Sequence, residues 1–256
     1  MKILVTNDDG YQSKGIVALT DALVADGHEV WVCAPSLERS ASSHAMTLRQ
    51  EIVITEFGPQ RYHCSGTPVD CILYATRANL FKELPDLVIS GINHGFNIST
   101  DILYSGTVGA AREAALTGMH AMAVSCSRDE RGNYSFDRAA SFVIDHLDAF
   151  YELTSPSCIL NINIPANGNG KWLSGVPAYL DYHDAIDSQA LKDSPGALSL
   201  MMKNTVYPSQ RCDTEQSDFE VVNSGYTSVT ALAVLPPVNE QVQLHLDRLS
   251  REEGHV

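Results

Sequence analysis

MKILVTNDDG at residues 1–10 and DLVISGINHGFN at residues 86–97 decide the fold of this chain. Each stretch begins with a short apolar run and then changes to small and oxygen-bearing side chains. The first run stops at the adjacent carboxylates Asp8 and Asp9, and the second is followed by Asn93. The pattern predicts two strands of one parallel sheet, with polar side chains at the edge where open α/β sheets bind their ligands.

Strands and helices alternate over the first 165 residues. Apolar residues at helical spacing indicate helices over 15–25, 108–116 and 136–153, and Thr67 is a suitable N-cap for another helix that runs to about Phe81. Short apolar runs between them indicate strands, and Thr47–Phe57 alternates like a half-exposed strand. The alternation predicts an α/β fold with a mostly parallel sheet and helices on both faces.

The composition changes near residue 167, where Gly, Pro, Ser and Asp surround short β-like pieces. We therefore expect a single domain over 1–256 with three parts. These are a core over 1–166, a protruding arm or hairpin region over 167–222, and a returning strand with a C-terminal helix over 223–256.

The charge balance is acidic, with 31 Asp and Glu against 17 Lys and Arg and a net charge of -14. Polymeric nucleic acid and anionic membranes are bound by clustered basic residues, so neither is an expected partner. No stretch approaches the roughly 18 apolar residues of a membrane span. The first residues lack the features of a signal peptide, and the six cysteines form no CxxC motif. We expect a cytoplasmic protein with free thiols and no structural zinc.

The candidate metal ligands are Asp8, Asp9, Ser40 and Asn93, which follow predicted strands at one edge of the sheet. Two neighbouring carboxylates repel one another unless a cation or protons intervene, and hard divalent ions prefer carboxylate, hydroxyl and amide oxygens. The alternatives are ordinary: Asp-Asp-Gly is common in turns, an Asp can cap a helix, and Asn93 can be a turn residue.

The tripeptide Ser105-Gly106-Thr107 directly precedes a predicted helix. Backbone N–H groups at such a position bind anions, and the two hydroxyls add donors, although a plain capped helix has the same pattern. Asn97 is a donor for a phosphate oxygen or a residue that holds its own loop. His94 is an acid or base, or a hydrogen-bonding loop residue.

Other phosphate chemistries lack their motifs. The chain has no GxxxxGK[ST] and no GxGxxG, and no Arg stands six positions after Cys126. Because the two aspartates are adjacent and not separated by one residue, a metal-activated water is favoured over an aspartyl-phosphate intermediate.

Several motifs, taken in order, resemble the survival protein SurE family. They are TNDDG at 6–10, APSLERSASS at 34–43, GTPVDC at 66–71, PDLVISGINHGFN at 85–97, YSGTVGAAREAA at 104–115, LNINIP at 160–165 and SGYTSVTAL at 224–232. The resemblance implies a Rossmann-like three-layer core with protruding β-hairpin or arm segments that exchange between subunits of a homodimer or homotetramer.

The resemblance also implies an activity and a site. The activity is that of a metal-dependent nucleoside monophosphate phosphohydrolase, a 5'-nucleotidase that can also act on 3'-nucleotides, with one divalent cation, Mg²⁺ or Mn²⁺, per subunit. The substrate is a nucleoside monophosphate. By motif position, the metal ligands are Asp8, Asp9, Ser40 and Asn93, the catalytic residues include Asp8, Asp9 and Asn97, and the phosphate is bound by Asn97, Ser105, Gly106 and Thr107.

The chain departs from the family pattern at Lys14, Ala41, Ser99 and Ala114, and three of these, all but Lys14, stand where the family usually has glycine. These departures motivate an alternative of another class, a nucleotide-sensing protein that binds the same ligand with little turnover. A nicotinamide-dependent oxidoreductase on the same fold lacks its fingerprint.

Overall fold

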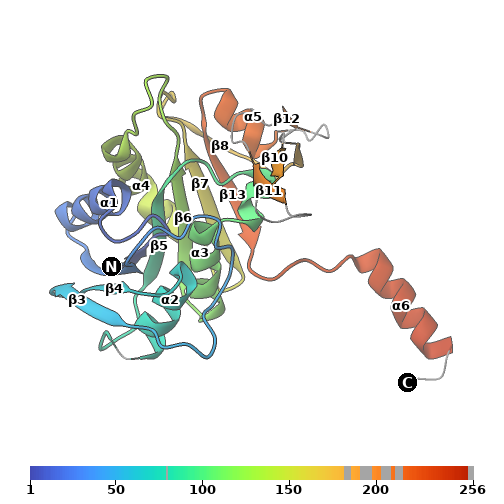
Figure 1. Cartoon of the computed structure of the whole chain (residues 1–256), viewed down its shortest axis with the longest axis horizontal. Coiled ribbons are helices and arrows are strands. Elements are labelled where there is room, and N and C mark those ends of the chain that lie inside the picture. Colours follow the sequence, from blue (N-terminus) through green and yellow to red (C-terminus); the bar gives the residue numbers. More distant parts are fainter. Residues whose placement is uncertain (79, 182–185, 191–197, 203–208, 211–215, 253–256) are drawn as a thin grey trace.

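The structure is a computed structural model that describes residues 1–78, 80–181, 186–190, 198–202, 209–210 and 216–252. Within these residues the main sheet has nine strands (Figure 1). From edge to edge they are β3 (Ile54–Gly58), β4 (Arg61–Cys64), β2 (Glu29–Pro35), β1 (Lys2–Thr6), β5 (Leu87–His94), β6 (His120–Cys126), β7 (Cys158–Ile164), β13 (Thr227–Ala233) and β8 (Trp172–Ser174).

The sheet is mostly parallel. Adjacent strands from β4 to β7 are parallel, whereas β3 pairs antiparallel with β4 and β13 pairs antiparallel with β7. Parallel neighbours require crossover connections, and here helices supply most of them, as expected from the alternation in the sequence.

Helices cover both faces of the sheet, so the core has three layers (Figure 1). Helices α1 (Lys14–Ala25) and α4 (Phe136–Tyr151) bury their apolar residues against one face, and α2 (Pro68–Arg77) and α3 (Gly106–Leu116) cover the other. The strands between these layers are apolar on both sides, which is typical of parallel sheets. The predicted Rossmann-like α/β fold is confirmed.

Strands β1 and β5 lie side by side, with Thr6 opposite Ser90. Asp8 and Asp9 leave the end of β1 at the level where β5 carries Asn93, so the two stretches that opened the sequence analysis meet at one edge of the sheet. The expectation that both runs are strands of one parallel sheet is confirmed.

Some element bounds differ from expectation. Helix α2 ends at Arg77 and not near Phe81, and the strand expected over 47–57 begins only at Ile54. The loop before β3 is bonded to α2. Thr47 donates from both its backbone N–H and its hydroxyl to the buried carboxylate of Asp70. This long-range contact is invisible to local periodicity.

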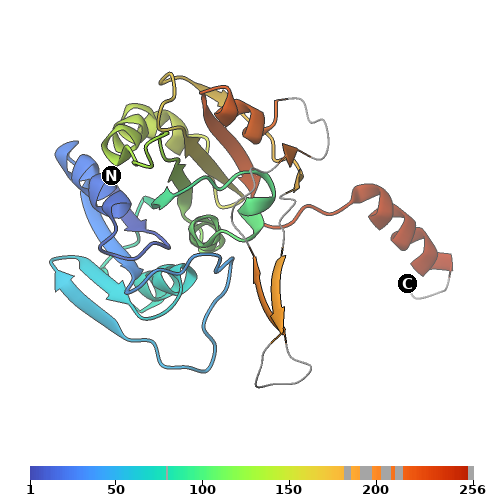
Figure 2. The same ribbon diagram turned by 45° about the horizontal axis from the view of Figure 1, so that its top comes forward.

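The region expected as an arm has two parts: one joins the main sheet, and the other forms two small sheets. Strand β8 extends the main sheet beside β13, and α5 (Asp218–Asn223) packs against β13. Strands β9 (Leu180–Asp181) and β12 (Ser209–Gln210) form one small sheet, and β10 (Ile186–Ala190) and β11 (Leu198–Met202) form another that projects from the core in Figure 2. The division into a core over 1–166, an arm over 167–222 and a last part over 223–256 stays a prediction.

Helix α6 (Glu240–Glu252) lies apart from the core in both views (Figures 1 and 2). Its apolar side chains Val242, Leu244, Leu246 and Leu249 are exposed. Among the described residues, none of the helices has the length and apolar character that a membrane crossing requires.

Helix α1 approaches β5 so closely that only glycine fits at position 15. A Cβ on Gly15 would lie 2.0 Å from the carbonyl oxygen of Ile92. At Gly58 the nearest atom to an added Cβ, on Arg61, is 3.6 Å away.

We expect Gly15→Ala to lower the free energy of unfolding by about 1–3 kcal/mol, because the backbone must shift to relieve the overlap. Gly58→Ala, the control, should change it by less than about 0.5 kcal/mol. Urea unfolding followed by circular dichroism measures both. Equal effects of the two substitutions would show that the α1–β5 contact is not as close as described.

Candidate functional site

A pocket of about 230 Å³ opens where β1, β2 and β5 end. This is the carboxyl edge of the sheet, at which ligands of open α/β folds bind. Four of the predicted metal and substrate residues, together with Ser105 at the start of α3, line it. The complete lining is Asp8, Ser40, Ala41, Asn93, His94, Phe96, Asn97, Asp101, Tyr104 and Ser105.

The Asp8 carboxylate is buried against the N-terminus of α3. The hydroxyl of Thr107 donates to Oδ1 of Asp8 over 2.6 Å, and the backbone N–H of Thr107 donates to Oδ2 over 3.2 Å. A Cβ on Gly106 would lie 3.0 Å from Cβ of Asp8, so glycine permits this approach. The positive end of the helix dipole therefore meets a fixed negative charge.

Burial raises the pKa of Asp8 to about 6, the hydrogen bond from Thr107 opposes this shift, and the charge of Asp9 adds to it. The carboxylate thus lies in an environment that favours its charged form less than water does. A bound cation would reverse that preference, because an adjacent positive charge stabilises the ionised form.

Asp9 points toward β5. Its Oδ2 lies 2.8 Å from Nδ1 of His94 and accepts from the His94 backbone N–H over 3.2 Å. The His94 ring also packs edge-on against Tyr134 and Phe136, which fixes its position. These contacts agree with the interpretation of His94 as a hydrogen-bonding residue that orients the Asp9 carboxylate, although it ends β5 and does not lie in a loop.

Ser40 comes from a loop that is fastened on both sides. The backbone N–H of Arg39 donates to the carbonyl of Asp8 over 2.7 Å, and that of Ser43 donates to the carbonyl of Tyr104 over 2.9 Å. The Ser40 hydroxyl itself donates to Glu38. The loop holds Ser40 at the pocket although its side chain is exposed.

Asn93 lies near the end of β5, and its side-chain nitrogen donates to the carbonyl of Gly95, just after the strand, over 2.9 Å. The amide oxygen is thereby the atom that can face a cation. The structure places Asn93 within β5, so it is not a turn residue, and its geometry is compatible with an oxygen ligand.

Asn97 is held by three polar residues from the neighbouring strands. Its backbone N–H donates to Asn163, its carbonyl accepts from both Asn161 and Asn163, and its side-chain nitrogen donates to Ser125 over 2.9 Å. All four residues are buried, so these bonds fix both the backbone and the amide of Asn97 at the wall of the pocket.

The loop after Asn97 is fastened to α5. Ser99 donates its backbone N–H to the fully buried carboxylate of Asp218 over 2.7 Å, and its hydroxyl bonds to the same carboxylate. The Ser99 hydroxyl also accepts from the backbone N–H of Ala178 over 3.0 Å. Burial raises the pKa of Asp218, and the bonds from Ser99 oppose that shift.

Two departures from the family pattern have a common conformation. Ala41 has φ +55° and Ser99 has φ +53°, which is the left-handed region that favours glycine. The backbone path is therefore the one that a glycine would take. At Ser99 the hydroxyl compensates through its bonds to α5, and at Ala41 no contact among the described residues offsets the strain.

The predicted phosphate loop has a different arrangement from the one expected. Thr107 directs its hydroxyl and its N–H at Asp8, and Ser105 accepts from the N–H of Val108 as the N-cap of α3. Gly106 and Thr107 are buried, and only Ser105 of the three lines the pocket. The anion that this helix start binds in the structure is the Asp8 carboxylate; phosphate binding by the three residues stays a prediction.

The donor set is suited to a hard divalent cation. Within the described residues there is no group of three or more His, Cys, Asp or Glu side chains that could hold a metal ion. The candidate ligands are instead two carboxylates with a hydroxyl and an amide oxygen, the types that Mg²⁺, Mn²⁺ and Ca²⁺ accept. The buried Asp8 beside Asp9 is the observation that fits a cation, because burial raises the pKa of Asp8 and the charge of Asp9 adds to that shift.

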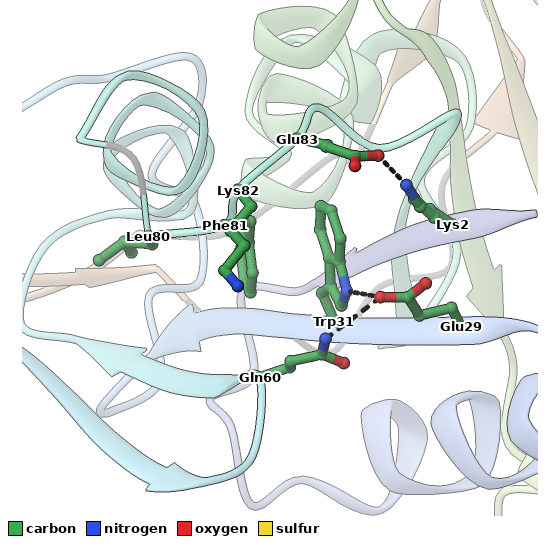
Figure 3. A pocket seen from close by; sticks show the side chains of 8 residues that line it. All are labelled: Lys2, Glu29, Trp31, Gln60, Leu80, Phe81, Lys82 and Glu83. Carbon is green, nitrogen blue, oxygen red and sulfur yellow. Dashed lines mark hydrogen bonds and ion pairs between the residues drawn. The ribbon is translucent and has the colours of Figure 1, made fainter.

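A larger cavity, of about 380 Å³, lies at the opposite edge of the sheet (Figure 3). Trp31 and Phe81 stack there with ring centroids 4.4 Å apart, and Glu29 accepts from the Trp31 indole. Lys2 pairs with Glu83 across the opening. Glu29 also accepts from the side chain of Gln60, so most polar side chains of this cavity bond to one another, and we interpret it as a structural feature at the end of the core.

Sequence reasoning missed Ser125, Asn161, Asn163 and Asp218 as supports of the site. The signal for three of them is present in the sequence: polar side chains stand in the otherwise apolar strands AVSC and LNINIP. A buried strand rarely carries an asparagine without a partner, so its presence indicates a polar network. Nothing in the sequence near Asp218 indicates its bond to Ser99.

The fold and the pocket define a Rossmann-like α/β protein with an oxygen-rich site at the carboxyl edge of its sheet. Residues 3–178 match the family described as Survival protein SurE. The chain belongs to this family.

Individual relatives of known name belong to the same family. The chain is 37% identical to a 5'-nucleotidase SurE of Synechococcus elongatus, in an alignment that covers 98% of this chain and 100% of the relative. It is 46% identical to a 5'-nucleotidase SurE of Treponema pallidum over 64% of this chain and 89% of that relative. The crystal structure of the Sure protein from Aquifex aeolicus superposes on this chain with a TM-score of 0.82 at 28% identity. The superposition covers 98% of this chain and 100% of the Aquifex aeolicus chain.

The raised pKa of Asp8 predicts a pH dependence of stability in metal-free protein. The folded state holds the Asp8 proton up to about pH 6, whereas the unfolded chain releases it near 3.8. The contribution of Asp8 to the free energy of unfolding is therefore complete below about pH 4. It is lost as the pH rises from there to about 6, by up to about 3 kcal/mol.

Asp8→Asn removes this titration. In EDTA, the free energy of unfolding of Asp8→Asn minus that of the wild type should become more positive between about pH 4 and pH 7, by up to about 3 kcal/mol. Urea unfolding at each pH measures it. A difference that does not change with pH would contradict the buried environment of Asp8.

Asp218→Ala should lower the free energy of unfolding by about 2–3 kcal/mol, because the buried N–H of Ser99 loses its acceptor. Glu220→Ala, in the exposed part of the same helix, is the control and should cost less than about 0.5 kcal/mol. Urea unfolding compares them. Similar losses in both variants would show that the Ser99–Asp218 contact contributes little.

Proposed function

We propose that the protein is a metal-dependent phosphohydrolase that converts nucleoside monophosphates to nucleoside and phosphate, as the names of its 5'-nucleotidase SurE relatives indicate. The observation that carries the proposal is the placement of Asp8. A buried carboxylate, fixed by α3 and adjacent to Asp9, shares one pocket with Ser40, Asn93 and Asn97. These are oxygen and amide groups suited to a cation and a phosphate.

The metal would be held by Asp8, Asp9, Ser40 and Asn93, with one ion, Mg²⁺ or Mn²⁺, in each subunit. When bound, such a cation neutralises charge on the phosphate and favours attack at phosphorus. Asp8 is the most rigid of these ligands, because both of its oxygens accept from Thr107.

Asp9 and Asn97 would act on the reacting groups. Asp9, oriented by His94, positions the attacking water and accepts its proton. Water adds to phosphorus as the ester P–O bond breaks, and the leaving oxygen of the nucleoside takes up a proton. Asn97 and Ser105 would bind the phosphate oxygens from the pocket wall, and the N-terminus of α3 at Gly106 and Thr107 would add its dipole.

The alternative, a nucleotide sensor with little turnover, was motivated by Ala41 and Ser99 in place of glycine. Both residues adopt the backbone conformation of a glycine, so these substitutions do not displace the loops that carry Ser40 and Asn97. This geometry favours the enzyme over the sensor.

The assembly we propose is a homodimer or homotetramer in which projecting segments are exchanged between subunits. The β10–β11 hairpin and α6 are the segments that project, and the exposed Leu200, Met201 and Leu244 supply apolar surface for such contacts. Light scattering that shows a strict monomer would contradict exchange.

The activity is tested by phosphate release from 5'- and 3'-nucleoside monophosphates with Mg²⁺, Mn²⁺ or EDTA. We expect release that depends on the metal, and we expect Asp8→Asn to lower kcat by at least about a hundredfold while the protein stays folded. Asp148→Asn, on the exposed face of α4, is the matched control and should behave like the wild type.

Metal-dependent release that persists in folded Asp8→Asn would contradict the site. No release from folded wild-type protein with any metal, combined with calorimetric binding of a nucleotide, would favour the sensor.

A further inference from the structure

Glu113 is a buried carboxylate that neither the proposed metal site nor the proposed phosphate site uses. It lies in the later half of α3, the helix whose Thr107 holds Asp8, and its side chain is only 6% exposed. Burial of a carboxylate is unfavourable without a partner, because the group loses its hydration. The partner is His44, whose Nε2 lies 2.8 Å from Oε2 of Glu113.

His44 belongs to the loop between β2 and β3 that carries Ser40. Ser40 is exposed, whereas the side chain of His44 is 31% exposed and bonded to α3. Because an ionised carboxylate only accepts hydrogen bonds, Nε2 of His44 is the donor. The pair therefore ties the loop of one candidate metal ligand to the helix that fixes another.

The backbone of the same loop is packed closely against α3. A Cβ on Gly109 would lie 2.4 Å from the carbonyl oxygen of Ser43. A Cβ on Gly106 would lie 2.4 Å from Oγ of Ser42 and 3.1 Å from Oδ2 of Asp8. Glycine at these two helix positions leaves the space that the loop occupies, and the loop reaches α3 beside the Asp8 carboxylate.

Ser43 has a backbone conformation that requires support. Its φ is +54°, in the left-handed region that is unfavourable for most residues with a side chain. Such a conformation persists where the surroundings fix it. The N–H of Ser43 donates over 2.9 Å to the carbonyl of Tyr104, which follows η1 (Ser99–Leu103), and the next side chain, His44, is bonded to Glu113. The two contacts hold the segment that directly follows Ser40 and Ala41.

From this arrangement we infer that His44 and Glu113 are positioning residues of the metal site, which hold the Ser40 loop against the helix that also fixes Asp8. The inference rests on the proposed function, because it requires Ser40 and Asp8 to bind one cation. Helix α3 then sets the distance between two ligands from different loops: Thr107 holds one of them directly, and Glu113 holds the loop of the other through His44.

The test measures the Kd for Mn²⁺ by electron paramagnetic resonance titration of the wild type, His44→Ala and His44→Gln. We expect His44→Ala to raise the Kd about tenfold, because Ser40 loses its fixed position. The amide nitrogen in His44→Gln can still donate to Glu113, so this variant should bind Mn²⁺ within about twofold of the wild type. Unchanged affinity in His44→Ala, or equally weak binding by both variants, would overturn the inference.

His120→Ala is the matched control for the loss of a histidine hydrogen bond. His120 lies 2.8 Å from the hydroxyl of Thr154, as His44 does from Glu113, but it begins β6 at the end of the strand away from the site. Its replacement should leave the Kd for Mn²⁺ unchanged. Equal weakening in His120→Ala and His44→Ala would assign the effect to a general loss of stability and overturn the positioning role.

Gly109→Ala tests the same contact with both members of the pair in place. The added methyl group overlaps the carbonyl of Ser43, so the loop must move away from α3 and the Kd for Mn²⁺ should rise about tenfold. Unchanged affinity in this variant would contradict the dependence of the metal site on the packing of the loop.

Failure of the proposed function has a different signature, namely no binding of Mn²⁺ by the wild type. The loop is then followed without metal, by hydrogen exchange of residues 39–43 in EDTA with mass spectrometry. Exchange that is at least about tenfold faster in His44→Ala than in the wild type and His120→Ala supports the positioning of the loop. Equal exchange in the three proteins overturns it.

Discussion

The contact between the Asp8 carboxylate and the start of α3 is the interaction on which the site depends. Both oxygens of the carboxylate accept from Thr107, and the helix dipole lies behind them. Burial of this group is unfavourable for its charge, and α3 with the Thr107 hydroxyl offsets part of that cost. A bound cation can offset the rest of this cost. The burial that destabilises the metal-free protein therefore favours metal binding.

The rest of the site is built on loops, and polar contacts to rigid elements hold each of them. The loop of Ser40 is bonded to the backbone just after β1 and just before α3, Asn97 is bonded to β6 and β7, and Ser99 is bonded to α5. Loops alone would not hold functional groups in place with the accuracy that catalysis needs. Residues as distant in sequence as Ser99 and Asp218 therefore support one pocket.

Much of the fold could be predicted from the sequence, because it is determined by local patterns. The apolar runs that end at Asp8 and before Asn93 are such patterns, and so is the helical spacing of α1 and α4. The late start of β3 was not predictable, because Thr47 is held by Asp70 far along the chain. Strand β8 is short and exposed, so its pairing with β13 leaves no periodic signal.

The candidate site was predicted in part for the same reason. Residue types at strand ends indicated Asp8, Asp9, Ser40, Asn93 and Asn97, and the structure brings most of them to one pocket. The direction of each side chain depends on its partners, and these were not available from the sequence. Thr107 shows this most clearly: its position at a helix start predicted a phosphate ligand, and the structure shows it bonded to Asp8.

The most direct measurement of the central claim is the affinity for Mn²⁺ of the wild type and of Thr107→Val, by electron paramagnetic resonance titration. Valine keeps the shape of threonine and removes the hydroxyl that positions Asp8. If Asp8 is a metal ligand held by α3, the variant should bind one Mn²⁺ about 10–100-fold more weakly. Unchanged affinity in a folded variant would contradict the account, because the metal would then not depend on the carboxylate that Thr107 holds.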